Sequence, residues 1–332
     1  MNLYFFSSFV FIISIIFLLF FTINPMKLGK ILNLVDYPNT QEHKKHMTPT
    51  PSVGGVFIYI LCLNYFFICT TFNLEMKGDV LIYFFILFNF IFWLGIADDL
   101  FKIRAVHRII IIITFIYIVN LNFNSFNINF FYSEIFNSRI KVILFEPLFT
   151  AVCFFILYNI FNMLDGINGL VIAYSLGCIC IIFTFLNYPV FFIMLFLMLI
   201  ILIILNLKNK LFLGNNGSSL LSFIIAFSII QGSKENEIFF SDINILLLFF
   251  LPFIDFLRLF FFRLFSKKNP MNGDNNHFHH LVINKVKAPI WVFLLLIYFT
   301  FYYFFINYVS SLIYISILVL IYFYLINKFK KI

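Results

Sequence analysis

The feature that most constrains this chain is a succession of apolar runs, most of them near 20 residues long and separated by short polar breaks. A helix rises about 1.5 Å per residue, so about 20 apolar residues are needed to cross the hydrocarbon core of a bilayer. Hydrophobic residues make up 63% of the 332 residues and charged residues only 11%, which excludes an ordinary soluble globular protein. The sequence predicts an all-α, polytopic integral membrane protein.

Division at the polar breaks predicts about eleven transmembrane helices in a single transmembrane domain, residues 1–332. The first run has no positive residue before it, so we expect a retained helix and not a cleaved signal. The five cysteines lie inside apolar runs, which suggests neither a disulfide framework nor a zinc site. The predicted helices are 3–24, 53–73, 80–97, 106–122, 147–163, 169–187, 189–206, 217–232, 243–264, 289–306 and 309–327.

Lysine and arginine are concentrated on alternate loops. One set of loops, together with the C-terminal tail, holds seventeen of the 22 Lys and Arg residues; the opposite loops hold four, and Arg258 lies inside the ninth run. Cytoplasmic loops are rich in these residues, so the N-terminus is predicted outside and the C-terminus in the cytoplasm of a plasma (inner) membrane. The net charge of +8 then reports topology, and nucleic-acid binding is not needed to explain it.

Two adjacent carboxylates, Asp98 and Asp99, stand at the inner end of the third predicted helix, with Lys102 one turn further on. Such a pair can bind a hard cation or divide the roles of base and ligand. A solvated helix end with an ion pair to Lys102 explains the same pattern. Both interpretations stay open at this point.

The next two inner loops are rich in amides and glycine. In NIFNMLDGINGL, Asn162 and Asp165 are three residues apart and share a face if the helix continues. In GNNGS, which starts at Gly214, free N–H groups at a helix start would suit phosphate oxygens. An ordinary N-cap and turn explains the second segment equally well.

Histidines and a buried acid mark the ninth predicted helix and the loop that follows it. His277, His279 and His280 could bind a metal or hydrogen-bond to sugar or phosphate. Asp255 and Arg258 lie one turn apart in an apolar run. Intramembrane carboxylates are candidates for function, but this pair could also serve only to neutralise its own charges.

The first inner loop supplies Lys44, Lys45 and His46 just before a ProThrPro segment and a glycine pair. A basic loop of this kind could be only a topology determinant. The outer segment 123–146 shows no recognisable constellation and is expected to be a connector. All five polar motifs thus fall on the predicted cytoplasmic side, where they gather carboxylates, amides, cations and imidazoles.

The order of these motifs resembles the polyprenyl-phosphate N-acetylhexosamine-1-phosphate transferases. The resemblance extends from Asp36 to Leu281, and the HxHH motif indicates the N-acetylglucosamine branch rather than the muramoyl-pentapeptide branch. The motifs are DxPN and HKKHxxPxPxxGG within 36–55, DDxxK at 98–102, NxxDGxxGL at 162–170, GNNGS at 214–218, PxxD at 252–255 and HxHH at 277–280.

This resemblance implies a glycosyltransferase reaction at the cytoplasmic face. The phosphate of undecaprenyl (polyprenyl) phosphate attacks the β-phosphorus of a UDP-N-acetylhexosamine and releases UMP. The product would start a lipid-linked cell-envelope polysaccharide, as in cell wall or lipopolysaccharide biosynthesis. The implied cofactor is Mg²⁺, with Mn²⁺ as the alternative. The implied partners are the two substrates and membrane lipid, and a homodimer is left open.

The resemblance also implies residue roles. The catalytic residues would be Asp98, Asp99 and Asp165, and the metal ligands would be these three with Asn215. The substrate-binding residues would be Lys44, Lys45, His46, Lys102, Asn162, Gly217, Ser218, Asp255, His277, His279 and His280.

Three positions depart from the family pattern. Asn215 stands where the family usually has Asp, and Gly273 and Asn275 stand where Pro and Arg are common. An asparagine carbonyl can ligate Mg²⁺ but brings no charge. The alternative hypothesis is therefore a relative that binds lipid phosphate or nucleotide sugar with little or no turnover. A transporter is disfavoured because the carboxylates are predicted at the inner edge of the membrane and not in its middle, and because the sequence shows no internal repeat.

Overall fold

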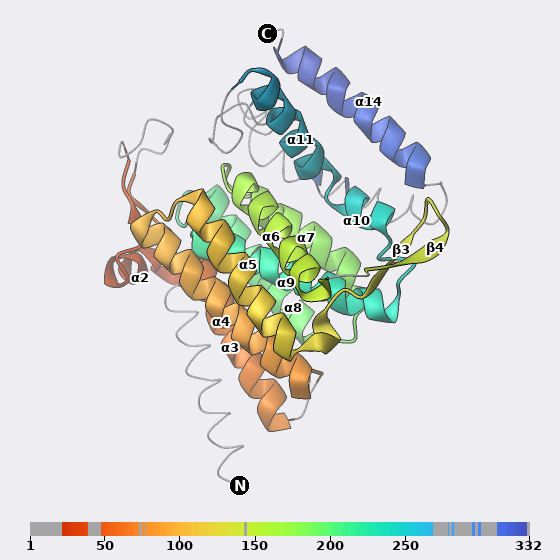
Figure 1. The fold of residues 1–332 in the computed structure, drawn as a ribbon. Coiled ribbons are helices and arrows are strands. Elements are labelled where there is room, and N and C mark those ends of the chain that lie inside the picture. Colours follow the sequence, from red (N-terminus) through yellow and green to blue (C-terminus); the bar gives the residue numbers. More distant parts are fainter. Residues whose placement is uncertain are drawn as a thin grey trace.

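The computed structural model describes residues 22–38, 48–72, 75–76, 78–142, 145–267, 278, 281, 294–295, 298–299 and 311–330. Helices dominate this part of the chain (Figure 1). They are α2 (Pro25–Ile31), α3 (Gly54–Phe72), α4 (Gly78–Phe101), α5 (Ala105–Asn122), η1 (Asn124–Phe126), α6 (Glu146–Leu164), α7 (Leu170–Phe183), α8 (Pro189–Leu207), α9 (Gly214–Glu235), α10 (Asp242–Leu248), α11 (Phe250–Phe265) and α14 (Ser311–Lys330). Two small antiparallel sheets pair β1 (Val35–Asp36) with β2 (Thr50–Pro51) and β3 (Phe130–Ser133) with β4 (Ser138–Lys141).

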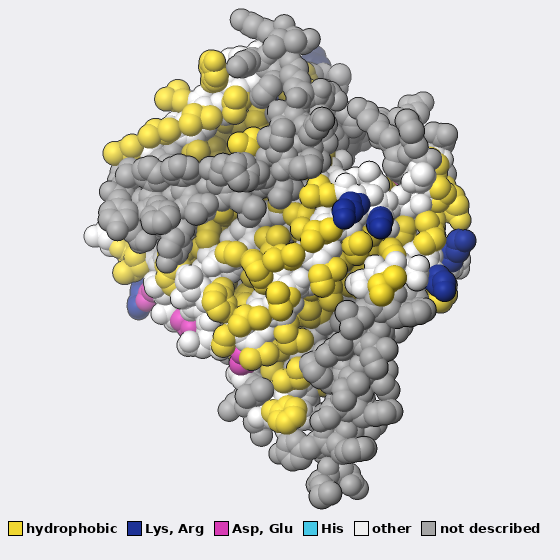
Figure 2. Space-filling view, turned by 180° about the vertical axis from the view of Figure 1, so that it is seen from behind, with side chains coloured by type: hydrophobic (Ala, Val, Ile, Leu, Met, Phe, Trp, Pro, Cys, Tyr) yellow, Lys and Arg dark blue, Asp and Glu magenta, His cyan; other side chains and the backbone are white. Residues whose placement is uncertain are grey.

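Five of these helices, α3, α4, α5, α6 and α8, are long and apolar enough to cross a membrane, and α10 with α11 makes a sixth if the bent pair is one span. Figure 2 shows hydrophobic side chains over the middle of one face, with most Lys and Arg toward the upper right and Asp and Glu toward the lower left. The described helices agree with the predicted all-α membrane class. The count of eleven and the sides of the termini stay predictions, and most of helices 3–24 and 289–306 lies outside the described residues.

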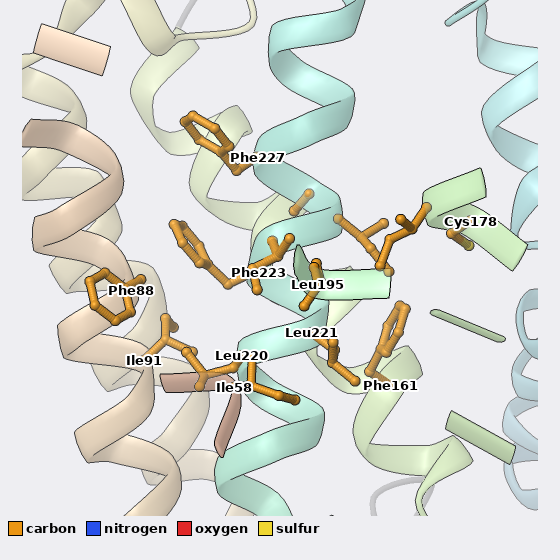
Figure 3. Close-up of a cluster of buried hydrophobic side chains, with 14 of the residues drawn as sticks. Ile58, Phe88, Ile91, Phe161, Cys178, Leu195, Leu220, Leu221, Phe223 and Phe227 are labelled. Carbon is orange, nitrogen blue, oxygen red and sulfur yellow. The ribbon is translucent and has the colours of Figure 1, made fainter. Parts of the chain in front are cut away.

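Helix α9 forms the centre of the bundle. Its side chains Leu220, Leu221 and Phe223 are buried, and side chains from α3, α4, α6, α7 and α8 surround them (Figure 3). Several serines accompany the apolar residues, and Ser222 and Ser228 donate hydrogen bonds to carbonyls of α9 itself, at 2.6 and 2.7 Å. Their hydroxyls are thus satisfied without water, which a buried helix in a membrane protein requires.

The ninth predicted helix, 243–264, is broken and not continuous as predicted: α10 and α11 meet at a bend of 84°. Pro252 explains the break, because it has no N–H to donate to the carbonyl of Leu248. The Tyr174 hydroxyl of α7 donates to that carbonyl instead. The Tyr298 hydroxyl donates to the Leu247 carbonyl at 2.5 Å. The polar groups freed by the bend are therefore satisfied inside the protein.

The outer segment 123–146, expected to be a connector, contains η1 and the β3–β4 hairpin. Asp242, at the start of α10, accepts hydrogen bonds from the Ser133 hydroxyl at 2.7 Å and from the Glu134 backbone at 3.1 Å. Arg139 of β4 forms an ion pair with Glu237. The segment is thus a folded cap on the ends of α9 and α10, and the connector prediction was wrong in this respect.

The loops sort into two groups at opposite ends of the helices. At one end, the Phe212 backbone donates to the Pro51 carbonyl at 2.8 Å, which joins two loops predicted to be inner. At the other end, Glu75 accepts from the Val190 backbone at 2.6 Å, which joins a loop predicted to be outer to the outer end of the predicted helix 189–206. This grouping agrees with the predicted alternation of loops. Which end faces the cytoplasm stays a prediction.

Candidate active site

The start of α9 lies where three helices come close together. The Gly54 and Gly55 backbones donate to the carbonyls of Phe212 and Leu213, both at 3.1 Å, so the start of α3 is bonded to the segment before α9. A Cβ atom on Gly55 would overlap the Asn216 side chain. This is the physical reason for a glycine here: it lets the GNNGS segment pack directly against the backbone of α3.

Asp99 of α4 caps this helix start. Its two carboxylate oxygens accept hydrogen bonds from the backbones of Asn215 and Asn216, both at 3.0 Å, and from the Asn216 side-chain amide at 2.5 Å. A negative charge is favourable at the positive end of a helix dipole. Two of the N–H groups predicted to receive phosphate are therefore already bonded to Asp99.

Asp98 faces a different partner, Arg108 of α5. The Arg108 Nη1 atom lies 2.5 Å from the Asp98 Oδ2 atom, and Asp98 is only 3% exposed. Arg108 takes the place of Lys102 in the ion pair that was considered for this motif. Lys102 is exposed and ends α4, with a left-handed φ of 51°. From the sequence, Arg108 was interpreted only as a topology determinant. Its position in the first turn of the helix after Asp98 was the available sign that it could pair with that carboxylate.

Asp165 and Asn162 approach the same helix start from the end of α6. The Asn162 amide donates to the Asn215 side-chain carbonyl at 2.9 Å. Burial and the neighbouring Asp99 charge raise the pKa of Asp165 well above its usual range, and the Ser218 hydroxyl opposes this rise. The structure thus brings Asp99, Asn162, Asp165, Asn215 and Ser218 together from α4, α9 and the end of α6.

The oxygen donors of this group were tested for their fit to Mg²⁺. Among the described residues, no group of three or more His, Cys, Asp or Glu side chains could hold a metal. Two carboxylates, Asp99 and Asp165, do interact across the site, and Mg²⁺ is commonly held by one or two carboxylates with substrate phosphates. A cation would also offset the repulsion that raises the pKa of Asp165. The Asp99 Oδ1 atom and the Asn215 carbonyl each accept one hydrogen bond and keep a second lone pair, so these two groups and Asp165 would hold Mg²⁺. Asp98 is paired with Arg108 instead.

The other predicted site residues are more scattered. Gly217 packs against α3, while Ser218 donates to the Gly214 carbonyl at 3.3 Å. Asp255 is buried and forms an ion pair with Arg258 at 2.8 Å, as the charge-neutralising interpretation expects. The remaining predicted residues, Lys44, Lys45, His46, His277, His279 and His280, lie outside the described residues.

Comparisons with known proteins agree with these motifs. Residues 81–233 match the model of glycosyl transferase family 4. The chain is 27% identical over 300 residues to the undecaprenyl-phosphate alpha-N-acetylglucosaminyl 1-phosphate transferase of Escherichia coli O157:H7, covering 82% of this chain and 74% of that protein. It is 29% identical over 268 residues to the Thermotoga maritima protein of the same description, covering 78% and 76%. The resemblance predicted from the motif order is confirmed.

Proposed function

We propose that this chain, whose residues 81–233 match the model of glycosyl transferase family 4, transfers an N-acetylhexosamine 1-phosphate from a UDP-sugar to undecaprenyl phosphate. The family and the relatives indicate a polyprenyl-phosphate sugar-1-phosphate transferase. The observation that best supports the proposal is the meeting of Asp99, Asn162 and Asp165 at the start of α9. The product would begin a lipid-linked polysaccharide of the cell envelope.

In the proposed reaction, an oxygen of the acceptor phosphate forms a bond to the β-phosphorus of the UDP-sugar. The bond from that phosphorus to the bridging oxygen breaks, and UMP leaves with the electron pair. A phosphate monoester has a second pKa of about 6, so the acceptor is largely ionised near neutral pH. A general base therefore has little to contribute, and neutralising and aligning two polyanions is the main requirement.

The residues of the site divide this work. Asp99 fixes the start of α9 through its backbone hydrogen bonds, and Asn162 orients the Asn215 side chain. Lys102 is exposed at the end of α4, where its charge can attract phosphate. When bound by Asp99, Asp165 and the Asn215 carbonyl, Mg²⁺ would neutralise the charge on the diphosphate. Arg108 holds Asp98, so Asp98 is assigned a positioning role.

Asn215 favours a second candidate function, a protein that binds substrate with little turnover. An aspartate at this position would add a negative charge next to Asp99 and Asp165, and this charge would strengthen binding of a divalent cation. With asparagine, two carboxylates alone supply charge to the site. The two hypotheses differ in whether the unmodified chain turns over.

The decisive measurement is UMP release by the purified full-length protein with undecaprenyl phosphate and a panel of UDP-N-acetylhexosamines. We expect release that needs Mg²⁺, stops with a chelator and is lost in Asp165→Asn. Release by Asn215→Asp alone would support the binding-only relative. A folded protein without release in either form, across the whole panel, would contradict a transferase.

A further inference from the structure

Asp255 receives hydrogen bonds from three different parts of the chain. Its Oδ1 atom lies 2.8 Å from Arg258 Nη2 and 2.7 Å from the Tyr322 hydroxyl of α14. The backbone N–H of Phe278 donates to both carboxylate oxygens at 3.1 Å. Arg258 Nε also donates to the Tyr322 hydroxyl at 2.9 Å. One buried carboxylate therefore joins α11, α14 and residue 278.

Apolar packing reinforces this junction. Phe278, Tyr322 and Ile326 form a small buried cluster, separate from the main core, and Ile254 and Leu325 pack against it. The Phe278 and Tyr322 ring centroids are 5.2 Å apart. Phe278 is thus held through its backbone by α11 and through its ring by α14. Figure 1 shows these two helices side by side.

Phe278 is the second residue of the HFHH motif, so His277 and His279 are its direct neighbours in the chain. Consecutive Cα atoms are 3.8 Å apart, and fixing residue 278 therefore limits where both neighbours can go. We propose that Asp255 and Tyr322 form an anchor that positions the histidine motif, and that Asp255 is a positioning residue rather than a substrate ligand. The consequence for catalysis rests on the proposed function, whereas the anchor itself does not.

A carboxylate suits this position for a chemical reason. Both of its oxygens accept from the single Phe278 N–H, and its charge pairs with Arg258. An asparagine of the same shape would offer only one acceptor oxygen, and its amide N–H groups would face the donors that now bond to Asp255. It would also leave the Arg258 charge uncompensated. Asp255→Asn therefore tests the anchor with almost no change in volume.

Hydrogen exchange of the full-length protein in lipid nanodiscs measures the anchor directly. A hydrogen bond to a charged acceptor slows hydrogen exchange of the donor amide by about tenfold or more. We expect the peptide containing Phe278 to exchange at least about tenfold faster in Asp255→Asn and less strongly faster in Tyr322→Phe. Tyr324→Phe is the matched control, because Tyr324 is 65% exposed on the same helix, and it should leave the exchange unchanged.

Peptides from α9 should keep their wild-type exchange in all three variants, which shows that the bundle is intact. Unchanged exchange at Phe278 in both Asp255→Asn and Tyr322→Phe would overturn the anchor. Equal acceleration by Tyr324→Phe would overturn it too, because the effect would then not belong to the Asp255 junction.

Activity tests the positioning role separately. If Tyr322 acts through the histidines, Tyr322→Phe should lower kcat for UMP release in the wild type but add no further loss in a His279→Ala background. Losses that multiply in the double variant would overturn the positioning role. If the wild type releases no UMP, the proposed function fails, and the exchange experiment still decides whether the anchor exists.

Discussion

Asp99 caps the N-terminus of α9, a role that is usually filled by a Ser or Asp directly before the helix. The residue before α9, Leu213, has no side-chain acceptor and makes no capping hydrogen bond. A carboxylate from α4 therefore satisfies the first N–H groups, and the candidate site depends on contact between α4 and α9. The uncharged GNNGS segment can therefore belong to the proposed site, because Asp99 of α4 supplies a carboxylate to it.

Replacing Asp99 should therefore weaken the fold as well as the reaction. We expect Asp99→Asn to lower the free energy of unfolding by about 1–3 kcal/mol, because buried N–H groups lose a charged acceptor. Thermal unfolding in detergent measures the loss. Asp79→Asn at the exposed start of α4 is the control and should cost less than about 1 kcal/mol. Equal losses in the two variants would contradict the capping role.

The same substitution, asparagine to aspartate, should have different effects at the two asparagines of GNNGS: tighter metal binding at Asn215 and lower stability at Asn216. Asn215→Asp should raise affinity for Mn²⁺, measured by electron paramagnetic resonance, by about tenfold or more, since a carboxylate joins Asp99 and Asp165. Asn216→Asp should instead destabilise the protein, because the Asn216 amide donates to Asp99 and to the Ser52 carbonyl. Tighter Mn²⁺ binding in Asn216→Asp, with none in Asn215→Asp, would refute this assignment.

Some of these residue relations were predictable and others were not. Asn162 and Asp165 were placed on one face by helical spacing, and both are found at the start of α9. Asp98 and Asp99 look equivalent in sequence, but adjacent helical residues point about 100° apart. One meets Arg108 and the other α9. Only the packing of three helices decides which is which.

At the scale of the elements, apolar length located the helices well, but it did not reveal how they bend. The run 243–264 is apolar throughout, and Pro252 was the available sign of the break. The β3–β4 hairpin was missed because its strands have four residues each and no regular alternation of apolar and polar residues. Contacts with Asp242 and Glu237, more than 90 residues away, stabilise it.

The bend between α10 and α11 should depend on the tyrosines that satisfy it. We expect Tyr174→Phe to lower the free energy of unfolding by about 1–3 kcal/mol, because the Leu248 carbonyl would lose its donor in a buried site. Thermal unfolding, compared with Tyr324→Phe, checks this. A loss no larger than that of the control would mean that the hydroxyl is not what satisfies the bend.

At the scale of the whole molecule, the loops that the sequence assigns to one side of the membrane can be compared with the loops that meet in the structure. Alternating Lys and Arg content divided the loops into two sets, and the hydrogen bonds from Phe212 to Pro51 and from Val190 to Glu75 each join segments predicted on the same side. The charge pattern could therefore predict which segments share an end of the bundle in these two cases. It could not predict contacts such as Arg108 with Asp98, because charge counting treats every basic residue alike.

The predicted orientation can be tested by labelling intact bacterial cells with a membrane-impermeant maleimide. Lys234→Cys, in the last turn of α9 beside η1, should be labelled from outside, and Lys208→Cys, directly after α8, only after the cells are opened. Cys62, Cys69 and Cys178 are buried, but Cys180 is exposed and Cys153 is partly exposed, so both variants are made in a Cys153→Ala, Cys180→Ala background. The reverse pattern would place the candidate site on the outer side.

The Asp99 cap also has a consequence for biogenesis. Asp99 and its partner Asn215 are 116 residues apart, so at about 5–20 residues per second the ribosome needs roughly 6 to 23 seconds to make the second after the first. During that interval α4 must insert with its carboxylate still hydrated, since the helix that will receive it does not yet exist. The candidate site is thus completed only after α9 has been made, and a nascent chain that stalls before α9 would hold α4 in the membrane without the α9 residues of that site.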